Sequence, residues 1–186
     1  MALSETNRRI LLELAARSIG HGLKTHQPLP LEFTAFPAEL QAHGATFVTL
    51  ELRGALQGCI GMLHATRPLA VDVARNAYAA AFKDPRGRVL TENDLGALSI
   101  HISLLSPPEP MSFISEEDLL AQLRPGDDGL ILEEGANRGT LLPAVWKTIP
   151  DRRAFVNHVK LKAGLPGNYW SNTLQASRYT AEYFGN

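Results

Sequence analysis

The only cysteine of the chain, Cys59, lies between two glycines in the tetrapeptide Gly58-Cys59-Ile60-Gly61. Glycine gives a strand no side chain to pack, so the two glycines indicate a bulge or the close approach of another group. A thiol in this setting is a candidate nucleophile, with Gly58 and Gly61 giving a ligand access to the sulfur. The alternative is structural, because free cysteines are often buried and behave as small hydrophobic side chains.

A cysteine nucleophile requires a base or a positive charge that stabilises the thiolate. The side chains that can serve are His64, His101 and Arg86, which lie on separate segments of the chain. His101 alternates with Ser103 along a predicted strand, where the alternative to a chemical role is a half-exposed surface histidine. Ser103 is a candidate binding residue of the same site.

Three further polar residues are candidates for ligand binding or acid–base chemistry. Asp84 and Arg86 stand directly after a predicted helix, where they can bind a polar ligand. The alternative is a surface turn in which Asp84 caps local backbone groups. Glu109 lies between two prolines and is a candidate general base, with a solvated loop carboxylate as the alternative. The predicted site has the candidate catalytic residues Cys59 and Glu109 and the candidate binding residues Gly58, Gly61, Asp84, Arg86 and Ser103.

The sequence lacks the familiar cofactor and metal motifs. There is no phosphate-binding P-loop, no dinucleotide-binding glycine fingerprint and no Gly-x-Ser-x-Gly nucleophile elbow. One cysteine excludes a four-cysteine metal site, and the six histidines show no zinc-protease spacing. We therefore predict no metal site, and the residues specify no cofactor.

Composition and charge limit the classes of partner. A formal net charge of -1 at pH 7 offers no basic surface for nucleic acid or for an anionic membrane. No apolar run approaches the roughly 20 residues that span a bilayer, and the N-terminal segment is charged where a secretory signal is hydrophobic. A single cysteine excludes an internal disulfide. These features predict a soluble cytoplasmic protein that binds neither nucleic acid nor membrane.

Hydrophobic periodicity predicts helices and a hairpin in the first half of the chain. Ser4 caps a helix that we expect to run to about His21 or Gly22, with Gly20 and Gly22 as stop signals, and Thr66 caps a second helix. Alternation places Leu56 on the face of Gly58 and puts Cys59 on the opposite face, unless a glycine bulge changes the count. The predicted strands are Ala45–Leu52, Ala55–Leu63 and Leu98–Leu105, and the second helix covers Pro68–Lys83.

The second half is predicted to mix short helices with strands. Ser115 and Asp151 are expected N-caps of helices that end near Leu123 and Ala163. The predicted strands are Gly129–Glu134, Gly139–Leu142 and Leu174–Phe184, and a short helix starts at Pro143. Hairpins mixed with helices, without regular strand–helix alternation, indicate an α+β fold with a largely antiparallel sheet.

Several segments, taken in order, resemble the AMMECR domain, which in prokaryotes also appears as protein A of the AmmeMemoRadiSam system. The resemblance covers roughly Ala42 to Phe184. Its motifs are Gly58-Cys59-Ile60-Gly61, Asn76–Arg86, Ser103–Met111, Asp128–Leu132, Arg138–Trp146, Leu161–Pro166 and Arg178-Tyr179-Thr180.

The resemblance implies one two-lobed α+β domain over residues 1–186. Its larger lobe is a mainly antiparallel β-sheet flanked by helices, and its smaller lobe is α/β. An N-terminal helix and extended connection occupy residues 1–44, ahead of core motifs in residues 45–184. Cys59 maps onto the family's characteristic cysteine motif, near a cleft expected between the lobes.

The resemblance also implies companions, since prokaryotic members resemble partners of a Memo-like protein and a radical S-adenosylmethionine enzyme. One hypothesis is a small-molecule or catalytic site around Cys59 that acts in their pathway. The alternative is a non-catalytic interaction or scaffold module for those partners. Gln57 stands where the family usually has arginine, which removes a fixed positive charge two residues from the thiol.

Overall fold

The computed structural model describes residues 2–186, which form two compact units. The first unit extends to Leu105 and also includes Glu182–Asn186, and the second unit is Ser106–Ala181. Each unit has its own four-stranded sheet and its own hydrophobic core. Helices combined with antiparallel strand pairs confirm the predicted α+β class.

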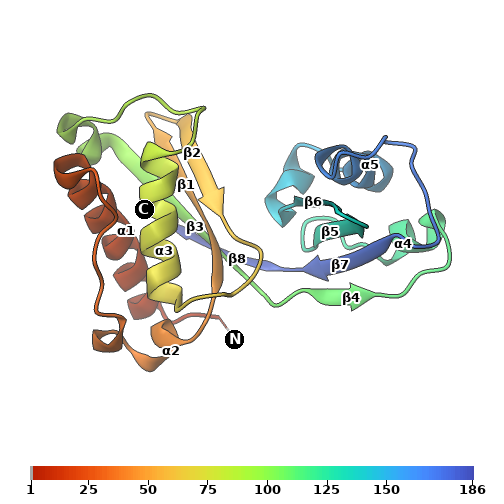
Figure 1. The fold of residues 1–186 in the computed structure, drawn as a ribbon, viewed down its shortest axis with the longest axis horizontal. Helices are drawn as coiled ribbons and strands as arrows, with labels where there is room; N and C mark the ends of the chain where they lie inside the picture. The colour runs from red at the N-terminus through yellow and green to blue at the C-terminus, as the bar shows by residue number, and fades with distance from the viewer. Residues whose placement is uncertain (1) are drawn as a thin grey trace. The chain divides into compact units, whose positions relative to one another are not determined.

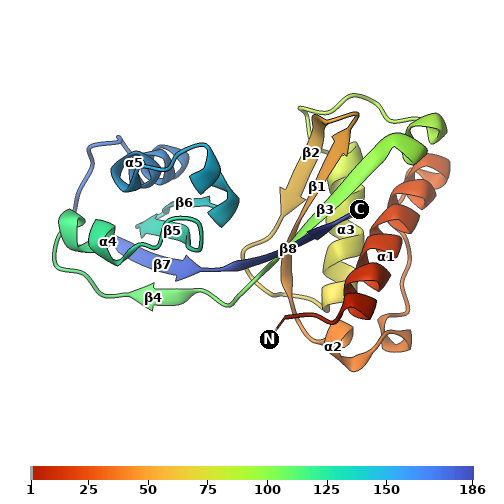
Figure 2. The ribbon, with the colours of Figure 1, turned by 180° about the vertical axis from the view of Figure 1, so that it is seen from behind.

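The sheet of the first unit has the strand order β2-β1-β3-β8 (Figure 1). Long helices α1 and α3 lie next to each other and cover one face of this sheet, whereas Figure 2 shows the face that no helix of this unit covers. The elements of this unit are α1 (Glu5–Thr25), η1 (Phe33–Ala35), α2 (Ala38–Gln41), β1 (Ala45–Leu52), β2 (Ala55–Gly61), α3 (Leu69–Phe82), η2 (Glu92–Ala97), β3 (Leu98–Leu105) and β8 (Ala181–Gly185).

Alternating side chains of β1 and β3 build the core of the first unit. The inward row packs against the helices and includes the buried residues Val48, Leu50, Ile100 and Ile102. Alanines of α3 complete this core, because their short side chains let the helix backbone approach the sheet. The strands at 45–52 and 98–105 are confirmed with the predicted bounds.

A bulge in the β1–β2 hairpin sets the position of Cys59. The ladder pairs Glu51 with Leu56 but Leu50 with Gly58, so Gln57 is the extra residue. Gln57 is consequently buried, while Leu56 is 48% exposed and does not share the inward face of Gly58. The predicted grouping of Leu56 with Gly58 is therefore wrong, although Cys59 does lie on the face opposite Gly58.

One predicted helix end and one predicted N-cap are wrong. Helix α1 continues through Gly22 to Thr25 because Gly22 gives close packing against the rings of Tyr78 and Phe82. The helix ends at His26, which has the left-handed conformation, with φ of 56°. Helix α3 has Pro68 as its N-cap residue, so the Thr66 cap is also wrong.

The second unit has the sheet order β4-β7-β5-β6 and packs its helices on that sheet. Trp146 stacks on Phe155 in its core, with ring centroids 3.8 Å apart. Ser115 and Asp151 cap their helices as predicted. The elements are β4 (Glu109–Met111), α4 (Glu116–Gln122), β5 (Gly129–Glu134), β6 (Asn137–Leu141), η3 (Pro143–Lys147), α5 (Arg152–Lys162) and β7 (Gln175–Tyr179).

The single strand predicted at Leu174–Phe184 is two strands that belong to different sheets. Strand β7 pairs with β4 and β5, whereas β8 is the neighbour of β3. Thr180 separates the two strands. Its carbonyl accepts a hydrogen bond from the N–H of Ser106, and its own N–H donates to the Ser106 hydroxyl. The sequence does not predict strand β4, since Pro110 argues against a strand. Proline fits in β4 because β4 is an edge strand, where one side of the backbone has no neighbouring strand.

Candidate functional site

Cys59 lies on β2, the edge strand of the first sheet, and the chain after α3 binds its exposed backbone groups. The N–H of Cys59 donates to Oδ2 of Asp84 at 2.8 Å, and Nη2 of Arg86 donates to the Cys59 carbonyl at 3.2 Å. An unpaired strand edge is normally open to another strand. Asp84 and Arg86 close the edge at this residue and fix its backbone from both sides.

The side chain of Asp84 is buried and its carboxylate accepts several hydrogen bonds. Besides the Cys59 N–H, it accepts from the backbone N–H of Arg86 and from Nε and Nη2 of the Arg86 guanidinium. The bonds from the Arg86 side chain are the main cause that holds the pKa of Asp84 well below its usual range, and the bond from the Cys59 N–H is the second cause. Asp84 is therefore an ionised residue that positions its neighbours.

The Cys59 thiol is half-buried. Its neighbour Gly58 faces Ala80 of α3, so Cys59 lies on the opposite face of the sheet, which α1 and α3 leave uncovered. The bulge places it opposite Thr49, whose hydroxyl donates to Sγ at 3.2 Å. The backbone groups of Cys59 point away from β1, so this is a non-hydrogen-bonded pair, the type in which cross-strand side chains lie closer together. Thr49 is a site residue that the sequence did not indicate.

Arg86 is the cation that acts on Cys59. Its hydrogen bond to Asp84 is the main cause that raises the pKa of Arg86, and the charge of Cys59 contributes in the same direction. The Arg86 side chain is 58% exposed, so it presents part of its guanidinium to solvent. Of the three predicted partners His64, His101 and Arg86, the structure brings Arg86 to the cysteine.

His101 shares the open sheet face with Cys59 but lies two strands away. It pairs with Thr49 across β1 and β3, and its Nε2 is 3.9 Å from a Glu51 oxygen. Two strand spacings amount to about 10 Å, which is too far for a hydrogen bond to the thiol. His101 packs over the backbone of Gly185, and His64 is an exposed loop residue.

Both motif glycines are explained by close contacts inside the first unit. A Cβ at Gly58 would clash with the backbone carbonyl of Ala80, in the last turns of α3. A Cβ at Gly61 would clash with the ring of Phe47 and the carbonyl of Thr46. The close approach predicted from the glycines therefore comes from α3 and β1.

The remaining predicted site residues lie elsewhere. Ser103 is buried on β3 and pairs with Phe47, which in turn pairs with Gly61. Glu109 belongs to the second unit, where it lies exposed on β4 with an oxygen 3.5 Å from Nε of Arg178. The structure thus groups Cys59, Asp84 and Arg86 in one unit and places Glu109 in the other.

Gln57 occupies the bulge and points away from the thiol's open face. Its side chain is buried, and Nε2 donates to the backbone carbonyl of Arg88. Gly87 lies against the Gln57 backbone, so the loop after α3 packs on the bulge as well as on Cys59. The amide at position 57 therefore anchors the loop that carries Asp84 and Arg86.

Residues 2–186 contain no group of three or more histidine, cysteine, aspartate or glutamate side chains arranged to hold a metal ion. Within the same range, no helix combines the length and apolar character needed to cross a membrane.

Comparisons with known proteins identify relatives over nearly the whole chain. A protein from Methanothermobacter thermautotrophicus is 34% identical, with 98% of this chain and 95% of the relative covered. A protein from Thermotoga maritima is 37% identical over 80% of this chain and 82% of its own. The crystal structure of an uncharacterized protein from Pyrococcus horikoshii aligns with a TM-score of 0.89 at 32% identity, covering 99% of this chain and 93% of that one.

The model of the AMMECR1 family matches residues 12–184. The match includes the cysteine motif on β2 and the loop after α3 that binds it. The chain belongs to the AMMECR1 family.

Proposed function

We propose that Cys59 is the reactive group of a small-molecule site in the first unit of a cytoplasmic protein. One observation carries the proposal: Asp84 and Arg86 bind both backbone groups of Cys59, and Arg86 also supplies a positive charge beside it. This arrangement fixes the backbone that carries the sulfur. Reactive cysteines of proteins are found beside positive charges of this kind.

The chemistry that fits is attack of the thiolate on a small electrophile that carries an anionic substituent. Arg86 uses Nε and Nη2 to bind Asp84 and Cys59, while its Nη1 has no hydrogen-bond partner among the described residues. A guanidinium edge of this kind binds carboxylate or phosphate oxygens. Thr49 contributes a hydroxyl that donates to the sulfur.

A second candidate function is a non-catalytic module that binds a Memo-like protein and a radical S-adenosylmethionine enzyme. The observation that favours it is the position of His101, which lies two strands from the thiol. In this case the loop after α3 shapes a binding surface, and Cys59 packs without reacting.

Labelling with iodoacetamide distinguishes these functions. If Cys59 is a reactive residue, its thiol reacts with iodoacetamide at least as fast in the native protein as in the unfolded chain. Thr49→Val, which removes the hydroxyl that donates to the sulfur, then changes the rate in the native protein without unfolding it. Cys59→Ser is the control for labelling elsewhere. A native thiol that reacts only through unfolding contradicts the proposal. Calorimetric binding of both partners with equal affinity by wild type and Cys59→Ser supports the scaffold function.

A further inference from the structure

A cavity of about 470 Å³ lies in the first unit where α3 meets the edge strand β2. Its volume is within the range of small-molecule sites in proteins. One wall consists of Ile60 and Gly61 of β2 together with Met62, the residue after the strand, and the wall from α3 includes Ala79. The cavity is on the helix-covered side of β2, so it is separate from the Cys59 thiol.

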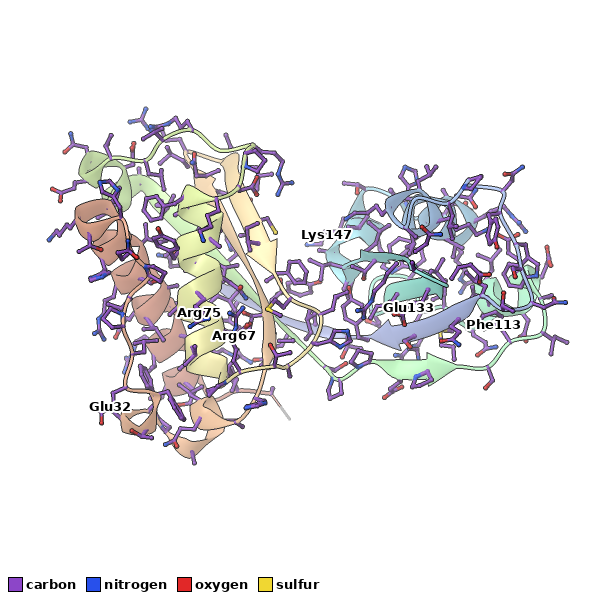
Figure 3. All side chains as sticks on the ribbon, in the orientation of Figure 1. Glu32, Arg67, Arg75, Phe113, Glu133 and Lys147 are labelled. Carbon is purple, nitrogen blue, oxygen red and sulfur yellow. The ribbon has the colours of Figure 1, made fainter. Side chains whose placement is uncertain are left out.

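Three cations line this cavity, namely Arg67, Arg75 and Lys83. Figure 3 labels the two arginines. Arg67 is neutralised, because its Nε donates to the buried carboxylate of Asp72 at 2.8 Å. Arg75 and Lys83 form no ion pair within the described part of the chain, and Lys83 only lies over the ring of Tyr78. The cavity therefore holds two uncompensated positive charges.

Helix geometry separates these two charges. Arg75, Ala79 and the C-cap residue Lys83 are spaced four residues apart, so they lie along one face of α3 and its C-terminal end. The first and last are two turns apart, about 12 Å along the axis. Ala79 lies between them and Ile60 and Met62 line the other wall, so the cations flank an apolar middle.

Asn76 and Arg67 fix one end of the cavity. The buried Asn76 amide donates to Asp72 and to the carbonyl of Thr46, while its oxygen accepts from Nη2 of Arg67. The same Arg67 nitrogen contacts Sδ of Met62. This network holds the arginine and the methionine in place before any ligand binds, which lowers the entropic cost of binding.

We propose that this cavity binds an elongated organic dianion with a negative charge at each end and an apolar middle, such as an aliphatic dicarboxylate. Arg75 binds one end and Lys83 the other, while Ile60, Met62 and Ala79 contact the carbon chain. The proposal is independent of the reactivity of Cys59.

The test is an NMR titration of the full chain with succinate, adipate, suberate, octanoate and inorganic phosphate. We expect saturable shifts at the Ile60–Met62 and Ala79 amides, with adipate or suberate binding more tightly than succinate, octanoate and phosphate. Arg75→Gln and Lys83→Gln should each weaken binding of the preferred dicarboxylate by about three- to tenfold. The matched control Lys24→Gln removes an exposed cation from α1 and should leave the affinity unchanged.

The outcomes that overturn the proposal are specific. Tightest binding by octanoate shows that a single charge is sufficient, and tightest binding by phosphate or succinate shows that no apolar middle is recognised. Equal weakening by Lys24→Gln and Arg75→Gln shows a non-specific charge effect. Absence of saturable shifts in a folded protein rejects the site altogether. Cys59→Ser should bind the preferred dicarboxylate with the affinity of wild type. The titration therefore tests the cavity even if the labelling experiment shows that Cys59 is unreactive.

Discussion

The carboxylate of Asp84 accepts a hydrogen bond from the backbone N–H of Cys59 at 2.8 Å, across 25 positions of sequence. Arg86 completes the connection by binding both this carboxylate and the Cys59 carbonyl. The loop after α3 thus replaces the neighbouring strand that β2 lacks. The main structural role of Asp84 and Arg86 is therefore to hold the backbone of Cys59 in place.

Asp84→Asn should destabilise the protein by about 1–3 kcal/mol, because it removes the charge that binds Arg86 and weakens the acceptor for the Cys59 N–H. Urea unfolding followed by circular dichroism measures the loss. Asp127→Asn is the matched control, since Asp127 is exposed on a turn. A free energy of unfolding equal to that of the control contradicts the role assigned to Asp84.

Acid should weaken the first unit through Asp84 and Asp94. Bonds from Arg86 and Cys59 lower the pKa of Asp84, and bonds from Arg88 and Thr91 lower the pKa of Asp94 to about 2, from an ordinary value of 3.8. A carboxylate whose pKa is lower in the folded state than in the unfolded state stabilises the protein at pH values above the unfolded-state pKa. This stabilisation is lost as the pH falls towards the folded-state pKa. The free energy of unfolding should therefore decline below about pH 4.

Unfolding of Asp84→Asn over the same range of pH distinguishes the contribution of Asp84 from that of Asp94. The variant should lose less stability between neutral pH and pH 3 than wild type, because one of the titrating groups is gone. Urea midpoints at each pH provide the comparison. Parallel curves for the two proteins are the result that this explanation does not allow.

Gly58→Ala should destabilise the protein by about 1–3 kcal/mol, since the new methyl group meets the backbone carbonyl of Ala80. Backbone atoms of α3 cannot turn aside as a flexible side chain can. Gly96→Ala is the control, because a Cβ there meets no atom within 4 Å. Thermal unfolding should give a lower midpoint for Gly58→Ala alone, and equal midpoints would rule out the contact.

The sequence predicted β1 and β3 with their bounds because apolar residues alternate along them, as Leu98, Ile100 and Ile102 do in β3, where each is buried. It missed the contact between Thr49 and Cys59 for a physical reason. A regular hairpin through Arg53-Gly54 pairs Thr49 with Gly58, and only the bulge at Gln57 moves Cys59 into that place. Local propensity does not specify a bulge that is stabilised by packing from another segment.

Long-range packing also explains the other differences. Gly22 predicted a helix end, but two aromatic rings of α3 make glycine the residue that fits inside α1. Thr180 divides a run that has continuous strand character, because the residues on either side pair with different sheets. The choice of Arg86 over His64 and His101 depends on where α3 ends relative to β2, which no pattern within either segment contains.

The ratio of Cys59 alkylation rates with iodoacetate and iodoacetamide tests the central claim most directly, since the first reagent is an anion and the second is neutral. A guanidinium beside the thiol should raise this ratio in wild type, and Arg86→Gln should lower it about threefold. Arg88→Gln removes a charge two residues away that instead pairs with Asp94, and it should leave the ratio unchanged. The same ratio in wild type and Arg86→Gln, both folded, would contradict an anion-binding thiol site at Cys59.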